Sequence, residues 1–216
     1  YLEELRRNLS DAEEKLSALS IQLSKMRQEA SKELTKAIRD GLLDLNFLDV
    51  QFEMVFTGTD HYTSAGTDEV EFMISMNPGE PVRSLGDVAS GGELSRIMLA
   101  IKTVMAEKDR IETLIFDEID VGISGRTAQK VSEKMAVIGR NHQVICITHL
   151  AQIAAMADAH FAIEKKVADG KTRTNISLLN KEEEIDELAR ILGGAEITEK
   201  VRESAAEMKE LAKNTK

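Results

Sequence analysis

The first 26 residues carry an unbroken periodic pattern of apolar positions. The apolar residues follow one another in alternating steps of three and four, at Leu2, Leu5, Leu9, Ala12, Leu16, Leu19, Leu23 and Met26. Such spacing, flanked by charged residues, is typical of the narrow seam of a coiled-coil helix. A bundle helix of a globular protein is the alternative, but its apolar face is usually wider. The pattern therefore predicts a long helix whose partner lies outside this sequence.

After residue 30 the apolar positions change phase but keep a helical spacing. They continue at Leu34, Ala37, Ile38, Leu42 and Leu45, as expected where a helix enters a hydrophobic core. A helix of roughly 40 residues is about 60 Å long at 1.5 Å per residue, which exceeds the width of a small domain. We therefore expect residues 1–45 to form a coiled-coil arm returning to a head, and residues 46–216 to form a lobe of that head.

Residues 46–88 show the alternation that is typical of strands. Apolar and polar residues alternate at 50–56 and again at 70–76, and the stretch at 57–68 between them is rich in Gly, Thr and Asp. This pattern predicts two antiparallel strands joined by a long polar loop. The only prolines, Pro78 and Pro81, then predict a second loop that leads toward residue 90.

From residue 91 onward helical and strand patterns alternate, which predicts an α/β fold. We expect helices at 91–107, 125–139, 151–157, 180–194 and 198–212, and strands at 112–116, 143–148, 160–165 and 174–179, with a turn at 169–170. Asn180 and Glu183 have the spacing of a capping box, which marks the start of one of these helices.

Composition limits the classes of protein to which the chain can belong. With 216 residues and 42% hydrophobic content the chain can bury a core, while a net charge of −10 excludes nucleic-acid binding over most of the surface. The single cysteine, Cys146, forms no intrachain disulfide and fits a reducing compartment. No stretch approaches the roughly 18 apolar residues of a membrane span. We therefore expect a soluble, cytoplasmic protein without a membrane partner.

Two adjacent carboxylates follow the apolar run at 114–116. Asp117 and Glu118 stand where open α/β sheets place their ligands, at the carboxyl end of a strand that we expect to be buried on both faces. Asp117 is a candidate Mg²⁺ ligand, directly or through water, and Glu118 is a candidate general base that polarises an attacking water. A solvated acidic loop is the structural alternative.

A glycine-containing turn precedes the helix predicted at 91–107. Ser90, Gly91, Gly92 and Glu93 stand at its N-terminus, where exposed backbone N–H groups and the positive end of the helix dipole favour an anion. Glycine also lets the backbone approach a phosphate closely. A simple N-cap and turn is the alternative.

Two further residues are expected at the same sheet edge. His149 follows the strand predicted at 143–148, so it lies near Asp117 if the two strands are neighbours, and it could touch a γ-phosphate. Asp120, in the turn after Glu118, could bridge to a partner subunit. For His149 the alternative is a structural histidine, and for the turn it is a helix-entry loop capped by Ser124.

Some motifs are excluded or left open. Residues 122–127 resemble a phosphate loop but have the wrong glycine spacing, and no G-x-x-x-x-G-K-[ST] motif occurs anywhere in the chain. The histidines show no metal-ligand spacing with Cys146, so no structural metal is expected. A small basic cluster at Lys165, Lys166, Lys171 and Arg173 is either a solvated turn or a DNA contact.

Taken together, these motifs resemble those of the ABC-type ATPases. Residues 89–93 resemble the signature motif of that family, 114–118 its Walker B strand, 120–122 its D-loop and His149 its switch histidine. A coiled-coil helix directly before these motifs is similar to the SMC-like branch. Within this branch, residues 116–125, 148–154 and 187–194 closely resemble a bacterial DNA-repair ATPase.

The resemblance implies a fold, a cofactor and partners. The fold is the C-terminal lobe of an ABC-type, P-loop NTPase-like ATPase head with an N-terminal coiled-coil helix. ATP and Mg²⁺ would lie between two engaged heads of a homodimer, with Ser90, Gly91 and Gly92 acting in trans. The phosphate loop, the Q-loop and the other coiled-coil arm would lie in a missing N-terminal half, so this chain alone is expected to be inactive.

The function implied is ATP-driven holding or tethering of DNA in double-strand break repair and recombination, in association with the nucleoid. A transporter nucleotide-binding domain is the alternative, but it should carry a phosphate loop before the signature, where residues 1–88 show heptads and a hairpin instead. A structural coiled-coil protein with a degenerate site is a third possibility, against which the Asp117 and Glu118 pair counts.

Overall fold

The computed structural model describes residues 1–88, 90–106, 108, 110–168, 171–194 and 196–215. The chain forms two compact units, Tyr1–Ala89 and Ser90–Lys216. This division falls after the β-hairpin that follows the first helix. The predicted division into an arm at residues 1–45 and a lobe at residues 46–216 separates parts by their expected function rather than by compactness, and it stays a prediction.

In the first unit, helix α1 spans Leu2–Asp44 and confirms the long helix that the heptads predict. Its seam is exposed from the first heptad leucine to Met26, as expected for a coiled-coil face without its partner. The change of phase is also confirmed, because Ile38 and Leu42 are buried near the end of the helix, and so is the following Leu45. Helix α1 thus has an exposed seam along its N-terminal part and a buried face near its C-terminal end.

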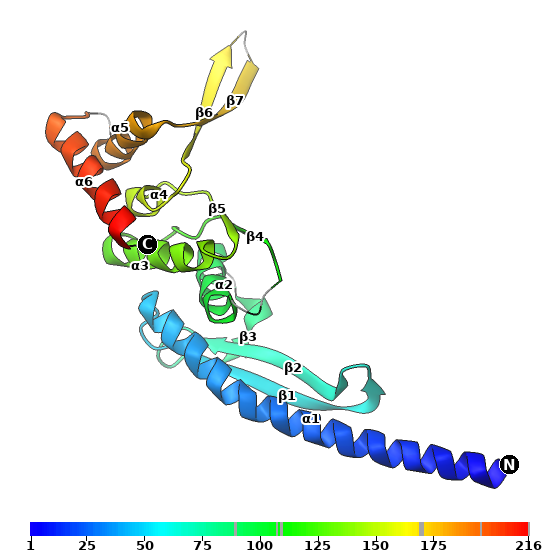
Figure 1. Ribbon diagram of the computed structural model, residues 1–216. Coiled ribbons are helices and arrows are strands. Elements are labelled where there is room, and N and C mark those ends of the chain that lie inside the picture. The colour runs from blue at the N-terminus through cyan, green and yellow to red at the C-terminus, as the bar shows by residue number, and fades with distance from the viewer. Residues whose placement is uncertain (89, 107, 109, 169–170, 195, 216) are drawn as a thin grey trace. The chain divides into compact units, whose positions relative to one another are not determined.

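A long hairpin, β1 (Gln51–Thr63) and β2 (Gly66–Ser75), runs along α1 within this unit (Figure 1). The predicted polar loop at 57–68 is wrong, because the two strands continue through it to a tight turn. Threonine suits a pleated, solvent-exposed strand, so polarity here reflects exposure rather than a loop. A short strand β3 (Arg83–Ser84) and a 3-10 helix η1 (Leu85–Asp87) follow, where only a loop was expected.

The hairpin is fastened to α1 by an ion pair. Arg27 Nη1 lies 2.9 Å from Asp68 Oδ2, and the Asp68 side chain is almost entirely covered. Hydrogen bonding from Ser24, and then from Arg27, holds the pKa of the Asp68 carboxyl below its ordinary value. The contact is therefore strongest with an ionised carboxylate. Its contribution is present above the unfolded pKa of about 3.9 and is lost as pH falls through the folded pKa.

We expect Arg27→Ala to loosen this end of the hairpin, because the covered Asp68 carboxylate loses a charged donor. Amide hydrogen exchange at neutral pH should become severalfold faster in β1 and β2 near Asp68 and stay unchanged in the second unit. Lys36→Ala is the control, since its ion pair with Asp40 on the same helix is exposed. Equal effects of the two substitutions would contradict the fastening role of Arg27.

The second unit has the alternating order that the sequence predicts. Its helices are α2 (Gly91–Met105), α3 (Gly125–Gly139), α4 (Ala151–Ala155), α5 (Lys181–Gly193) and α6 (Glu199–Thr215), and its strands are β4 (Thr113–Phe116), β5 (Gln143–Cys146), β6 (Phe161–Ala168) and β7 (Lys171–Leu178). The capping box at Asn180 is present, with reciprocal bonds to Glu183. The predicted turn at 169–170 and the expected helix end at Glu107 lie outside the described residues.

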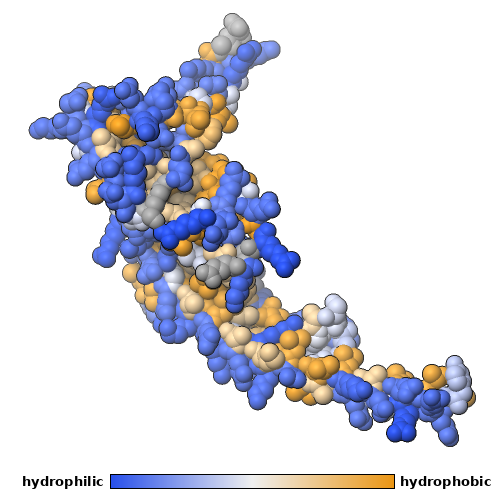
Figure 2. Space-filling view, viewed as in Figure 1, coloured by the Kyte–Doolittle hydropathy of each residue, from blue (hydrophilic) through white to orange (hydrophobic). Residues whose placement is uncertain are grey.

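The strands of this unit form two small sheets. Strands β4 and β5 pair in parallel, and β6 and β7 form an antiparallel hairpin. Strand β4 is not buried on both faces as predicted, since Ile115 is 67% exposed. Apolar residues also lie open on one face of the β6–β7 hairpin, where Figure 2 shows apolar surface; they are Phe161, Ile163, Val167, Ile176 and Leu178. Both sheets thus present apolar faces that lack a covering layer among the described residues.

Helices α4, α5 and α6 share a core of their own. Small and apolar residues of α4, α5 and α6 pack together around Met156 and Leu188 (Figure 1). Among the described residues, no helix combines the length and the apolar character that crossing a bilayer requires.

Candidate functional site

Strands β4 and β5 bring the predicted site residues to one edge. The two strands pair from Thr113 with Gln143 to Phe116 with Cys146, and Ile147 N donates to Phe116 O at 3.0 Å. The expectation that these strands are neighbours is therefore confirmed. Asp117 and His149 follow their carboxyl ends, at the edge where open α/β sheets hold ligands.

The turn after β4 has a tightly held backbone. Glu118 has a positive φ of 57°, which is uncommon for a residue with a side chain. Its N–H donates to Asp117 Oδ1 at 3.0 Å, and Ser95 Oγ on α2 donates to Asp117 O at 3.0 Å. The direction of the Glu118 side chain is thus set by a turn whose conformation the neighbouring helix supports.

Arg96 on α2 holds the rest of this turn. Arg96 is 8% exposed, and its guanidinium donates through Nη1 to Ile119 O at 3.3 Å and to Val121 O at 2.9 Å. Burial lowers the pKa of Arg96, and nearby Glu93 opposes that shift. The predicted signature helix and the predicted carboxylate turn are therefore connected through one buried side chain.

We expect Arg96→Lys to destabilise the second unit by about 1 kcal/mol, because lysine lacks the planar Nη1 group whose two N–H bonds reach both carbonyl groups. Urea unfolding followed by hydrogen exchange in this unit would measure the loss. Arg126→Lys is the matched control, since Arg126 is exposed on α3 and should change stability by less than about 0.5 kcal/mol. An Arg96→Lys variant with unchanged stability would show that the turn does not depend on the Nη1 hydrogen bonds.

The predicted anion site begins α2. Ser90 is its N-cap and accepts a bond from Glu93 N at 3.5 Å, so the N-cap alternative is present in this structure. A methyl group placed on Gly91 would lie 2.7 Å from Glu118 Oε2, so the Glu118 carboxylate stands against the start of the helix. Ala89, the first residue of the predicted signature, lies outside the described residues. Signature and carboxylate therefore share one surface of this unit.

Asp120 is buried, whereas a residue that bridges to a partner subunit would be exposed in the single chain. It is 4% exposed, and its Oδ2 accepts from Thr148 Oγ1 at 2.6 Å and from His149 N at 2.8 Å. His149 Nδ1 lies 3.0 Å from the same oxygen, while the rest of the His149 side chain is 72% exposed. In the single chain, Asp120 thus contacts the predicted switch histidine. A bridge from Asp120 to a partner subunit stays a prediction.

The electrostatics of Cys146 agree with a carboxylate-rich edge. Burial raises the pKa of its thiol to about 12, and the negative charges of Asp120 and Asp117 act in the same direction. The thiol therefore stays protonated at physiological pH and behaves as a small apolar residue of β5.

The Asp117 carboxylate is the candidate Mg²⁺ ligand at this edge. Within the described part of the chain, no group of three or more His, Cys, Asp or Glu residues could hold a metal ion. Mg²⁺ is usually bound by one or two carboxylates together with phosphate oxygens and water. The Asp117 carboxylate at the strand end fits that requirement as one protein ligand.

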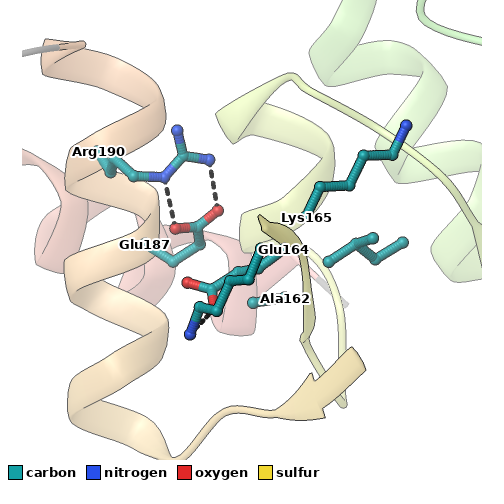
Figure 3. Close-up of a pocket in the computed structure, with 7 residues that line it drawn as sticks. Ala162, Glu164, Lys165, Glu187 and Arg190 are labelled. Atoms are coloured by element: carbon teal, nitrogen blue, oxygen red, sulfur yellow. Dashed lines mark hydrogen bonds and ion pairs between the residues drawn. The ribbon is translucent and has the colours of Figure 1, made fainter. Parts of the chain in front are cut away.

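A depression beside α5 does not belong to this site. Figure 3 shows Arg190 joined to Glu187 by two hydrogen bonds, with Glu164 and Lys165 of β6 beyond Glu187; each of these bonds is 2.7 Å long. Lys166, from the basic cluster, pairs with Glu164 at 2.8 Å. The opposite charges that line the depression largely pair with one another. For the basic cluster, a solvated turn and a DNA contact both stay predictions.

Sequence reasoning missed Ser95, Arg96 and the contact from Asp120 to Thr148. A signal for Arg96 was available, because it stands four residues after Gly92 and three before Leu99 on the buried face of α2. A charged residue at such a position needs partners for its donors.

Comparisons with known proteins decide the family. The whole chain aligns at 42% identity, over 219 alignment positions, with the DNA repair protein RecN of Halalkalibacterium halodurans, and at 36% identity, over 231 positions, with RecN of Bacillus subtilis. The chain is a homologue of the C-terminal part of RecN. It spans only 39% and 40% of the length of these two relatives. RecN of Treponema pallidum is 53% identical over 129 residues, which are 60% of this chain.

Solved structures agree on the fold of this RecN homologue. The SMC head domain of Pyrococcus yayanosii, with a coiled coil and joint, matches 76% of this chain and 29% of its own with a TM-score of 0.53 and 20% identity. The SMC head of Pyrococcus furiosus, bound to the C-terminal domain of ScpA, gives a TM-score of 0.52 over 77% of this chain and 39% of its own at 18% identity. The fold is thus that of an SMC ATPase head. No protein-family model matches the chain.

Proposed function

We propose that this chain is the C-terminal part of an SMC-like ATPase that acts on DNA in double-strand break repair and recombination. The observation that carries the proposal is the gathering of Asp117, Glu118, His149 and the α2 N-terminus at one edge of the RecN-like unit. The similarity to RecN supports the choice of DNA repair and does not favour a transporter domain. The protein would act in the cytoplasm at the nucleoid.

Each site residue has a role in this proposal that fits its surroundings. Bound ATP and Mg²⁺ would supply the reacting phosphoryl group and neutralise its charge. Asp117 holds the cation, and Glu118 accepts a proton from the attacking water. His149, open to solvent at the strand end, contacts the terminal phosphate.

The signature residues act on nucleotide held by a second head. Ser90, Gly91, Gly92 and Glu93 stand at the N-terminus of a 15-residue helix, where backbone N–H groups and the helix dipole favour a phosphate. Two heads of a homodimer would thereby enclose ATP, and hydrolysis would separate them. DNA held by the joined arms would be released or repositioned by that cycle.

The phosphate loop would come from the N-terminal part of a RecN protein, since this sequence contains no such loop. Two surfaces of the chain support such a partner. The α1 seam is exposed from Leu2 to Met26, and Ile115 and Ile145 lie open on the β4–β5 sheet. Apolar faces of this kind are normally covered in a folded protein.

The test is a chimera in which this chain replaces the matching C-terminal 39% of the H. halodurans RecN. We expect the chimera to hydrolyse ATP and to bind DNA ends, whereas the chain alone does neither. The parent RecN serves as the control for folding and assembly. A well-folded chimera without ATPase activity, or measurable hydrolysis by the chain alone, would contradict the proposal.

A further inference from the structure

Asp120 and His149 follow two neighbouring strands, β4 and β5, and contact each other closely. One carboxylate oxygen of Asp120 accepts hydrogen bonds from Thr148 Oγ1 at 2.6 Å and from His149 N at 2.8 Å, and His149 Nδ1 of the ring lies 3.0 Å from the same oxygen. The carboxylate is nearly inaccessible, with 4% exposure, while the ring is 72% exposed. A buried acceptor therefore holds one end of an otherwise open imidazole.

The chemistry of the pair fixes which ring nitrogen carries a hydrogen. An ionised carboxylate only accepts hydrogen bonds, so the arrangement that suits a separation of 3.0 Å is the one in which His149 Nδ1 carries the hydrogen. The hydrogen bond made by one ring nitrogen sets the tautomer and orientation of the whole ring. Nε2 is then the nitrogen left to meet a ligand at the strand edge.

The support of Asp120 extends back to α2. Arg96 donates to the carbonyl groups of Ile119 and Val121, the residues on either side of Asp120. The backbone that carries the carboxylate is therefore fixed before any ligand arrives. Such preorganisation is what a residue needs in order to orient another side chain.

We propose that Asp120 is a positioning residue that fixes the tautomer and direction of His149 in the same chain. The inference rests on the proposed function, because it assigns the oriented Nε2 to the nucleotide. It gives Asp120 an intrachain role in addition to any contact with a partner subunit. Without Asp120 the protein would still bind nucleotide, but a misdirected His149 ring would promote hydrolysis poorly.

The first test needs no nucleotide. Nitrogen NMR of the histidine rings of this chain, recorded at about pH 8.5 where exposed imidazoles are neutral, reports which nitrogen bears the hydrogen. His149→Gln assigns the signal among the four histidines. We expect Nδ1–H for His149. A predominant Nε2–H form in the unaltered chain would overturn the proposal, whatever the variants do.

Three substitutions separate positioning from simple packing. Asp120→Ala should lose the Nδ1–H preference, whereas Asp120→Asn should keep it because the amide oxygen can accept the same bond. Thr148→Val removes another bond to the same Asp120 oxygen at similar volume and should leave the tautomer unchanged. Equal loss in Asp120→Ala and Thr148→Val, or no loss in Asp120→Ala, would overturn the positioning role.

The second test uses the chimera with RecN. Asp120→Ala should lower kcat by about 10–100-fold with little change in KM, and it should add nothing to the loss caused by His149→Gln. Hydrolysis that is unaffected by Asp120→Ala overturns the positioning role and leaves the proposed function intact. A chimera that is inactive although His149 shows Nδ1–H overturns the proposed function and, with it, the catalytic meaning of the pair.

Discussion

Glu118→Gln is expected to lower ATP hydrolysis in the chimera with RecN by about 10²–10⁴-fold while leaving ATP binding intact. Glutamine keeps the shape of the side chain and can still hydrogen-bond water, but it cannot take a proton from it. The positive φ of 57° at residue 118 is retained, because the change lies at the end of the side chain. One substitution therefore separates the binding of ATP from its hydrolysis.

A second consequence concerns assembly. If hydrolysis separates the heads, the Glu118→Gln chimera should accumulate as an ATP-bound dimer, which size-exclusion chromatography with light scattering would detect. Glu112→Gln is the matched control, since Glu112 is exposed just before the same strand and should leave both rate and assembly unchanged. Retained hydrolysis in Glu118→Gln would remove this residue from the role of general base.

The parts of the fold that the sequence predicted are those with strong local signals. Heptad spacing predicted α1, and the capping box at Asn180 predicted the start of α5. Apolar runs ending in polar residues predicted that Asp117 and His149 share an edge, because parallel neighbouring strands end at the same side of a sheet. Each of these inferences depends on a few adjacent residues.

The errors arose where exposure, rather than local conformation, sets the pattern. The stretch at 57–68 was read as a loop because it is polar, yet it pairs as a strand beside α1. The exposure of Ile115 was missed because an apolar strand predicts burial, whereas burial also requires a covering layer. Contacts such as Arg96 with Val121 join residues 25 positions apart, which no local pattern encodes.

Gly92→Ala and Gly91→Ala are expected to differ sharply, although both add one methyl group to the start of α2. A Cβ on Gly92 would meet Glu118 O at 2.9 Å and Val121 Cβ at 3.2 Å, and neither is the end of a flexible side chain. Alanine should gain about 1 kcal/mol in helix propensity. Displacing the turn should cost about 3 kcal/mol. The net loss for Gly92→Ala is therefore about 2 kcal/mol.

At Gly91 the methyl group meets only the end of a flexible side chain, Glu118 Oε2 at 2.7 Å. The carboxylate can move aside, so Gly91→Ala should fold without loss of stability and yet lose hydrolysis in the chimera, because the general base is displaced. Gly139→Ala is the control, since a Cβ there meets nothing within 4 Å. Urea unfolding followed by hydrogen exchange in the second unit, together with ATPase rates, measures both effects.

These two glycines also distinguish a packing role from a nucleotide role for the signature. If Gly91 and Gly92 serve only the partner's nucleotide, both alanine variants should keep the stability of the chain and lose only nucleotide-dependent assembly. The contacts of Gly92 with Glu118 and Val121 argue for a second, intrachain role. Loss of stability in Gly92→Ala but not in Gly91→Ala would show that the signature turn also supports the carboxylate of its own head.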